Sequence, residues 1–397
     1  MNVADFLEFK GPRYFIPDWD DRVDADFDFV TEVSPNKGWA AESYAHELFP
    51  TPPYDGILVS KVVEEKSRQR RARLREFGVH AALRVAPEFP VLGDCGAFGY
   101  IDEPLPPYTC AEVLDYYTTC GFDLGVSVDH LIPTADHPDR DLRYRVTLEN
   151  AAEFFKEHRR RKLSWIPVGA VQGWDPESYA QAAEETAKMG YRLLALGGLV
   201  RASTPEILAI LRAVSAVLPR GAHLHLFGLS REALLPHLAA AQVASVDSAS
   251  SLRQAWLSPD QNYHTADFDY CAVRVPQSEG RGRKKAGAVG PAGAERELLD
   301  ALHAWDASAD PTAAELDDLM RLLTAYTLHC TPDFPPKRIE KMRRTLVERP
   351  WKACPCAICR ASGIDVVIFR GNNRNRRRGF HNTWVLYNRF LQLRSGM

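Results

Sequence analysis

Short apolar runs alternate with amphipathic stretches through the middle of the chain, from residue 56 onward. Stretches with helical periodicity separate the runs, as expected of repeated β/α units. Seven such units in series predict a parallel sheet and favour a (β/α)8 TIM barrel over a doubly wound sheet. We expect an eighth strand at Tyr270–Val275. The seven apolar runs are Ile57–Lys61, Phe89–Asp94, Leu124–Asp129, Ile166–Gln172, Arg192–Gly197, His223–Gly228 and Val243–Asp247.

Helix-start signals lie where this pattern requires them. Asp175-Pro176-Glu177 opens one helix, which Gly190 closes, and Ser203-Thr204-Pro205-Glu206 opens the next. Ser230-Arg231-Glu232 opens a third. A capping side chain followed by proline in the first turn is typical of a helix N-terminus.

The regular pattern covers only part of the chain, so we expect further parts around the barrel. A Gly- and Ala-rich basic stretch after the eighth strand predicts a flexible connection. The last residues have apolar period 3–4 and predict the final barrel helix. The expected parts are an N-terminal cap (1–55), the barrel strands with the active site (56–276), a basic linker (277–293), an inserted helical and zinc-binding subdomain (294–380) and the last barrel helix (381–397).

Composition places the chain among ordinary globular proteins. Its 397 residues are 45% hydrophobic and 25% charged, with a formal net charge of −3. No apolar run is long enough to span a bilayer, and the first residues have no signal-peptide pattern. Several of the eight cysteines are dispersed in apolar settings, which fits a reducing cytoplasm.

Three cysteines lie close together and a histidine follows them. Cys354, Cys356 and Cys359 span six residues, and His381 comes twenty-two residues after the last of them. Thiolates and an imidazole are the ligands of tetrahedral Zn²⁺, and four filled positions predict a structural ion rather than a catalytic one. The alternative is a chance cluster of reduced cysteines.

Arginines gather between the last cysteine and this histidine. Interleaved with three asparagines in a metal-braced loop, they predict a phosphate-binding surface, although a charge run is often only a solvated face. The candidates are Arg370, Arg374, Arg376, Arg377 and Arg378.

Polar residues end several of the predicted strands. Catalytic residues of such barrels lie at the C-terminal ends of the strands. A single carboxylate there is more often a helix cap, but three on one rim favour a site. Phe98 and Phe227 are placed either to sandwich a flat ring or simply to pack at the rim. The strand-end candidates are Asp94, Asp129, Gln172, Gly197, Gly198 and Asp247.

Paired carboxylates suit substitution at an anomeric carbon. One carboxylate attacks C1′ and holds the sugar covalently, while another moves protons on the departing and arriving groups. The sequence has no P-loop, and no GxGxxG opens a helix after a strand.

Together these motifs resemble the tRNA-guanine transglycosylase superfamily, from about residue 55 to residue 392. The matching segments are Gly93-Asp94-Cys95-Gly96-Ala97-Phe98, Val171-Gln172-Gly173, Ala195-Leu196-Gly197-Gly198-Leu199, Leu226-Phe227-Gly228, Val246-Asp247-Ser248-Ala249 and the Cys354–His381 motif. Cys95 and Ala97 replace the family's serine and glycine, and the gap before His381 is a few residues shorter than usual.

The resemblance implies a pentosyltransferase that exchanges guanine in a polynucleotide for a 7-deazaguanine. It implies that Asp247 is the nucleophile and Asp94 the general acid/base. Asp129, Gln172, Gly197, Gly198 and Leu199 would then bind the base, with Phe98 and Phe227 stacking on it.

The polynucleotide is the open point of this resemblance. The tRNA enzymes follow the nucleophile with a basic P-T-R-x-x-R segment, which Ser248–Trp256 lacks. The N-terminal Phe15–Asp24 segment and the overall length look like the branch that modifies DNA (the DpdA type). That branch implies insertion of 7-cyano-7-deazaguanine (preQ0), a restriction-modification setting and an accessory ATPase. The alternatives are a tRNA-guanine transglycosylase and a non-catalytic barrel that only binds nucleic acid.

Overall fold

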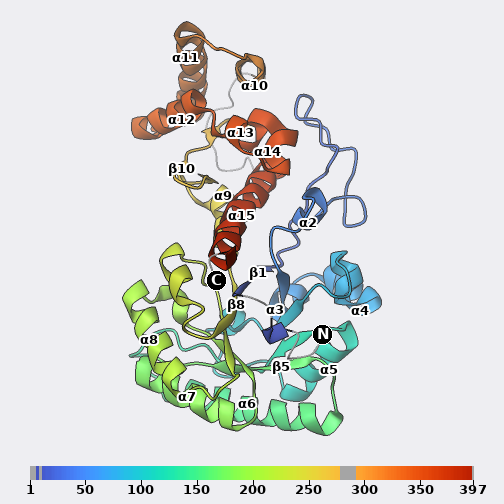
Figure 1. The fold of residues 1–397 in the computed structure, drawn as a ribbon. Helices are drawn as coiled ribbons and strands as arrows, with labels where there is room; N and C mark the ends of the chain where they lie inside the picture. The colour runs from blue at the N-terminus through green and yellow to red at the C-terminus, as the bar shows by residue number, and fades with distance from the viewer. Residues whose placement is uncertain (1–5, 9–10, 278–291, 396–397) are drawn as a thin grey trace. The chain divides into compact units, whose positions relative to one another are not determined.

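A computed structural model describes residues 6–8, 11–277 and 292–395 of the chain (Figure 1). The chain divides into two compact units. Unit 1 comprises Met1–Trp19, Tyr54–Ala249 and Arg389–Met397, and unit 2 comprises Asp20–Pro53 and Ser250–Asn388. Most of the linker predicted at 277–293 lies outside the described residues.

Unit 1 is a closed barrel of parallel strands, which confirms the predicted (β/α)8 fold. Each strand pairs with the next along the chain, and the first pairs with the last through Phe15 opposite Asp247. The strands are β1 (Arg13–Pro17), β2 (Gly56–Ser60), β3 (Val91–Asp94), β4 (Leu124–Val126), β5 (Ile166–Val171), β6 (Leu193–Leu196), β7 (His223–Leu226) and β8 (Val243–Asp247).

The eighth strand is not where the sequence pattern predicted it. The stretch expected at Tyr270–Val275 instead supplies β10 (Asp269–Tyr270), paired with β9 (Tyr263–His264), and β11 (Val273–Arg274), paired with β12 (Ile368–Phe369). The barrel is completed by β1, from the predicted cap. There the Tyr14 amide donates to the Asp55 carboxylate at 2.8 Å, and the strand pairs with both β2 and β8.

Helices follow most strands of unit 1, with the expected caps. The side chains of Asp175 and Ser203 accept backbone N–H groups of the first turns of α7 and α8. The helix expected after Ser230 is a short 3₁₀ segment. The helical elements are α3 (Lys61–Glu65), α4 (Arg68–Leu83), η1 (Ala97–Tyr100), α5 (Cys110–Cys120), α6 (Arg140–Arg161), α7 (Pro176–Lys188), η2 (Leu199–Arg201), α8 (Thr204–Val217) and η3 (Glu232–His237).

Alternate positions of the strands fill the barrel with apolar side chains. Ile166, Val168 and Ala170 of β5 share one buried cluster with Leu124 and Val126 of β4. Successive residues of a strand point to opposite faces, so this period of two is the sequence signature of the barrel interior. The filled interior leaves the strand ends as the place for chemistry.

Unit 2 is mainly helical, and its arginine-rich segment is a helix rather than the predicted loop. Helix α15 begins at Gly371, ten residues before the predicted start, and its final residues belong to unit 1. Among the described residues, no helix is long and apolar enough to cross a membrane. The helical elements are α2 (Ala45–Leu48), α9 (Ser250–Leu257), α10 (Ala292–Ala307), α11 (Ala313–Cys330), α12 (Pro336–Glu348), α13 (Pro350–Ala353), α14 (Ala357–Ser362), η5 (Gly363–Val366) and α15 (Gly371–Ser395).

Candidate active site and metal centre

Six neighbouring strands of the barrel, β3 to β8, each deliver a candidate residue to the same end. Because all strands run parallel, their carboxyl ends meet on one rim. The structure therefore brings the strand-end candidates together. In strand order they are Asp94 at the end of β3, Asp129 after β4, Gln172 after β5, Gly197 and Gly198 after β6, Phe227 after β7 and Asp247 at the end of β8.

Asp129 and Gln172 form a buried polar pair. The Gln172 side-chain amide donates to Asp129 Oδ2 at 2.7 Å, and both residues are almost fully buried. Asp129 Oδ1 and Gln172 Oε1 have no hydrogen-bond partner among the described residues. Burial raises the pKa of Asp129 to about 6. Unpaired buried acceptors of this kind are costly unless a ligand supplies donors.

The two glycines after β6 make room for this pair. A side chain on Gly197 would collide with the Gln172 amide. Gly198 has a φ of +79°, and a Cβ there would stand 2.8 Å from the Tyr179 hydroxyl. That hydroxyl donates to the Gly197 carbonyl at 2.7 Å. The diglycine therefore lets backbone and amide groups share a narrow space.

Asp94 is a partly buried carboxyl group with a shifted pKa. Burial is the main cause, the nearby charge of Asp129 adds to it, and together they raise the pKa of Asp94 to about 8. Backbone N–H groups of Gly96 and Cys95 oppose the shift, and the charge of Asp247 makes a smaller contribution in the raising direction. A carboxyl group in this state carries a proton near neutral pH and can donate it.

Asp247 has a different environment. Its Oδ1 accepts the backbone N–H of Gly228 at 3.1 Å and lies 3.2 Å from His225 Nε2. The other ring nitrogen, His225 Nδ1, lies 2.8 Å from Ser245 Oγ. His225 and Ser245 were not among the residues that the sequence pattern singled out. Each stands two residues before a candidate on its own strand, so the period of two that puts them on the same face was the available signal.

The remaining base-site candidates differ in exposure. Phe98, in η1, is 55% exposed, and Phe227 is half-buried with its ring centroid 4.9 Å from that of His225. Leu199 begins η2 and is buried. Phe98 and Phe227 keep ring surface accessible at the rim, which a planar ligand requires for stacking.

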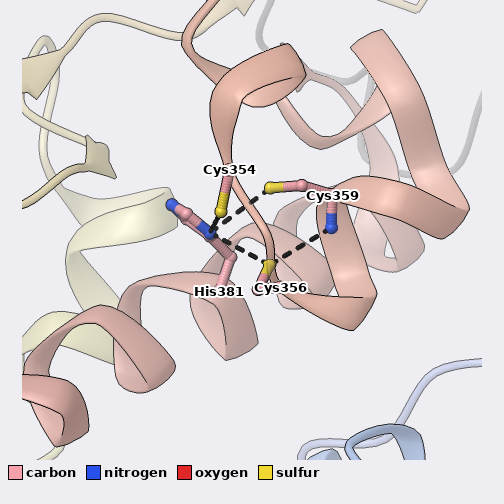
Figure 2. A group of neighbouring side chains, drawn as sticks. All are labelled: Cys354, Cys356, Cys359 and His381. Carbon is pink, nitrogen blue, oxygen red and sulfur yellow. Dashed lines mark hydrogen bonds between the residues drawn. The ribbon is translucent and has the colours of Figure 1, made fainter.

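The three cysteines and His381 come together as predicted, in unit 2. Their ligand atoms all lie within 4.8 Å of one another (Figure 2). His381 Nδ1 is 3.6, 3.5 and 3.4 Å from the Sγ atoms of Cys354, Cys356 and Cys359. Thiolates at about 2.3 Å and an imidazole at about 2.0 Å from one tetrahedral ion stand about 3.5 Å apart, so this cluster fits a single metal ion.

Neighbouring groups hold these ligands in place. His381 Nε2 donates to the His264 carbonyl at 2.7 Å, which leaves the Nδ1 lone pair for a metal. The Tyr263 ring stacks on the His381 ring with centroids 4.2 Å apart, and its hydroxyl lies 3.3 Å from Cys359 Sγ. This second layer of contacts is typical of a built metal site rather than a chance cluster.

The arginines do not form the predicted exposed surface. Arg370, Arg374, Arg377 and Arg378 are 0–6% exposed. Arg370 and Arg374 form ion pairs with Glu32, and they also pair with Glu295 and Asp365, respectively. Arg377 and Arg378 donate to backbone carbonyls, including those of Asp24 and Ala255.

Arg376 keeps some exposure but also has internal partners. Its guanidinium lies 3.2 Å from Asp21 and donates to the Arg22 carbonyl at 2.8 Å. Charges that are buried and paired inside a unit are not available to phosphates. The burial of four of the five side chains argues against the predicted phosphate-binding role.

Comparison with known proteins identifies a family and a relative of this chain. Residues 106–258 match the family model of queuine tRNA-ribosyltransferase. That segment contains Asp129, Gln172 and Asp247, whereas Asp94 and the Cys354–His381 cluster lie outside it. A protein of Salmonella montevideo described as DNA-guanine transglycosylase is 38% identical over 416 residues, which span 96% of this chain and 98% of that protein.

Proposed function

This chain belongs to the tRNA-guanine transglycosylase superfamily and is a guanine transglycosylase, and we propose that it replaces guanine in DNA with a 7-deazaguanine base. A relative that matches this chain over nearly its whole length is described as a DNA-guanine transglycosylase. The 247–256 segment keeps Arg253 but lacks the basic P-T-R-x-x-R pattern that the resemblance leads us to expect after the nucleophile of a tRNA enzyme.

The observation that carries this proposal is the pair of unsatisfied acceptors beside two carboxyl groups. Guanine presents N–H donors at N1 and at its 2-amino group, and Asp129 Oδ1 and Gln172 Oε1 are buried acceptors without partners among the described residues. A 7-deazaguanine carries the same donors, because it differs from guanine only at position 7. The same two acceptors therefore suit both the base that leaves and the base that enters.

The first displacement forms a covalent intermediate. An oxygen of Asp247 attacks C1′ of the deoxyribose, and the bond between C1′ and N9 breaks with its electron pair moving to the guanine. Asp94 supplies a proton to the departing base, which the raised pKa of its carboxyl group allows. The product of this step is an ester between Asp247 and the sugar.

The second displacement reverses the first with a new base. Asp94, now ionised, takes the N9 proton of the incoming 7-deazaguanine, and N9 attacks C1′. The ester bond breaks and its electron pair returns to the Asp247 carboxylate. Two inversions retain the configuration at C1′. A guanine in duplex DNA must first leave the base stack, at a cost of about a few kcal/mol.

The proposed metal is a structural Zn²⁺ held by Cys354, Cys356, Cys359 and His381. Three sulfurs and one imidazole nitrogen at tetrahedral separations suit zinc, and four protein ligands leave no position for a catalytic water. Such an ion would hold the Cys354–Cys359 segment against helix α15. Thiolate ligands require reduced cysteines, which fits the cytoplasm.

The resemblance adds three further elements to the proposal. They are 7-cyano-7-deazaguanine as the incoming base, a restriction-modification system as the setting, and an accessory ATPase as a partner. A second candidate function is exchange in tRNA, since the matching family model is named for tRNA.

Nucleoside mass spectrometry separates the two polynucleotides. The enzyme is incubated with 7-cyano-7-deazaguanine and either duplex DNA, single-stranded DNA or tRNA, and each is then digested to nucleosides. We expect the deoxynucleoside of the deazaguanine in a DNA sample and no modified ribonucleoside. The Asp247→Asn protein is the control. Modification of tRNA alone would contradict the proposal.

A further inference from the structure

The two oxygens of the Asp247 carboxylate have unequal surroundings. Oδ1 accepts the Gly228 backbone N–H and faces His225 Nε2. Among the described residues, no hydrogen bond reaches Oδ2. Asp247 is 6% exposed, so only a small part of the residue is open to solvent.

His225 is held rigidly below the carboxylate. The side chains of His225 and Ser245 are 0% and 1% exposed, and the two residues pair across β7 and β8. The His225 ring meets the Phe15 and Phe227 rings edge-on, with centroids 6.1 and 4.9 Å away. A ring enclosed on two sides by aromatic neighbours cannot turn to another partner without disturbing the barrel interior.

The ring's protonation follows from its two neighbours. Next to an ionised carboxylate, Nε2 must carry a hydrogen, because a lone pair there would face the negative oxygen. In the neutral ring Nδ1 is then an acceptor, and Ser245 is the group that donates to it. The serine hydroxyl thus selects the tautomer, and the histidine presents an N–H to Asp247.

We propose that Ser245 and His225 are positioning residues for the nucleophile. Together with Gly228 they hold Oδ1 by hydrogen bonds, so that Oδ2 attacks C1′ and Oδ1 becomes the carbonyl oxygen of the covalent ester. This inference rests on the proposed double displacement. It adds a defined donor pair, one backbone N–H and one imidazole N–H, on the oxygen that never bonds to the sugar.

The donor pair has opposite effects on the two half-reactions. While Asp247 is an ion, hydrogen bonds to Oδ1 stabilise it and moderate its attack. When the bond between C1′ and Oδ2 breaks, negative charge returns to the carboxylate, and the same donors stabilise that charge as it develops. Loss of the imidazole donor should therefore slow decay of the ester and should not slow its formation.

Three variants separate this role from simple packing. His225→Gln keeps an amide N–H near the position of Nε2, whereas His225→Asn places its amide near Nδ1, short of Asp247. Ser245→Ala removes the hydroxyl that selects the tautomer. For each protein, rapid quenching on a labelled DNA oligonucleotide gives the rate of adduct formation without added base. Decay is then followed after adding 7-cyano-7-deazaguanine.

We expect decay of the ester in His225→Asn to slow by about a hundredfold, the usual effect of removing one donor to a developing oxyanion, and we expect formation of the ester not to slow. His225→Gln should keep most of the wild-type rate of ester decay. The decay rate of Ser245→Ala should lie between those of His225→Gln and His225→Asn. A purely structural role would lower the amount of reacting enzyme and leave both rate constants unchanged.

Two results would overturn the inference. One is an unchanged ratio of decay to formation in His225→Asn, and the other is a His225→Gln protein as slow as His225→Asn. Either result can be obtained only if the wild-type protein forms the adduct, so neither result would contradict the proposed function. A wild-type protein that forms no adduct with DNA would contradict the proposed function itself, and this inference with it.

Discussion

At the scale of single residues, three aspartates on one rim differ because their surroundings differ. Burial and a neighbouring charge raise the pKa of Asp94, burial raises that of Asp129, and Asp247 receives a backbone N–H. Environments that separate carboxyl groups in this way assign them different tasks. In this account Asp94 moves protons, Asp129 binds the base and Asp247 attacks.

The raised pKa of Asp94 leads to a testable pH dependence. Base departure needs the protonated acid, so its rate should fall as pH rises through about 8. In Asp129→Asn the neighbouring negative charge is gone, so the falling limb should move to lower pH, even though base binding weakens. Single-turnover rates of guanine release at saturating DNA measure both effects. If the falling limb of the pH–rate profile lay at the same pH in Asp129→Asn as in wild type, the charge of Asp129 would not raise the pKa of Asp94.

The same shift has a consequence for stability. A carboxyl group that holds its proton more tightly in the folded state than in the unfolded chain stabilises the fold less as pH rises between the two pKa values. The stabilisation from protonated Asp94 is complete below the pKa of the unfolded chain, about 3.9. It is lost as pH rises to the pKa of the folded protein, about 8. Asp94→Asn, which cannot ionise, should therefore gain stability relative to wild type as pH rises over that interval.

Sequence reasoning located the rim candidates because each ends an apolar run. It could not locate the contact between His225 and Asp247. The pattern His223-Leu224-His225-Leu226 shows only that the two histidines share a face of the strand. Which neighbour they meet depends on strand register, and the β7–β8 pair contains an irregularity at Leu224 and His225.

At the scale of elements, helix α15 shows how a charge run can mislead. Arg370 lies four residues before Arg374, and Arg377 and Arg378 lie three and four residues after it, so all four side chains meet on the Arg374 face of a helix or its continuation. That face is buried, and its acidic partners come from distant segments, Glu32 and Glu295 among them. Nothing in the local sequence identifies those partners, so the cluster resembled a phosphate-binding loop.

Arg374→Ala should therefore destabilise unit 2 rather than weaken DNA binding. Arg374 is 2% exposed and pairs with Asp365 at 2.7 Å, and its loss leaves that buried carboxylate with His303 but without its guanidinium partner. We expect a loss of about 3–5 kcal/mol in the free energy of unfolding, as is usual when one member of a buried pair is removed.

Urea unfolding of Arg374→Ala and wild type measures this loss. Arg321→Ala is the matched control, because Arg321 pairs with Asp318 on an exposed helix face and its removal should change stability by less than about 1 kcal/mol. Unchanged stability combined with weaker DNA binding in Arg374→Ala would restore the predicted phosphate-binding role.

At the scale of the whole molecule, the sequence pattern predicted the barrel but not how it closes. Seven of eight strands were found because each begins a β/α repeat. The eighth, β1, precedes the repeats and is followed by the Asp20–Pro53 segment of unit 2. Its place depends on simultaneous pairing with β2 and β8, which no local pattern shows. The metal cluster was predictable because three of its ligands are neighbours in sequence.

The proposed exchange of bases at the rim proceeds through an ester on Asp247. The most direct test is to quench the enzyme with labelled DNA in the absence of an incoming base, digest the adduct and identify the modified peptide by mass spectrometry. We expect deoxyribose-linked DNA on Asp247 in the wild-type protein and no adduct in Asp247→Asn. An adduct on another residue, or guanine exchange that persists in Asp247→Asn, would contradict this account.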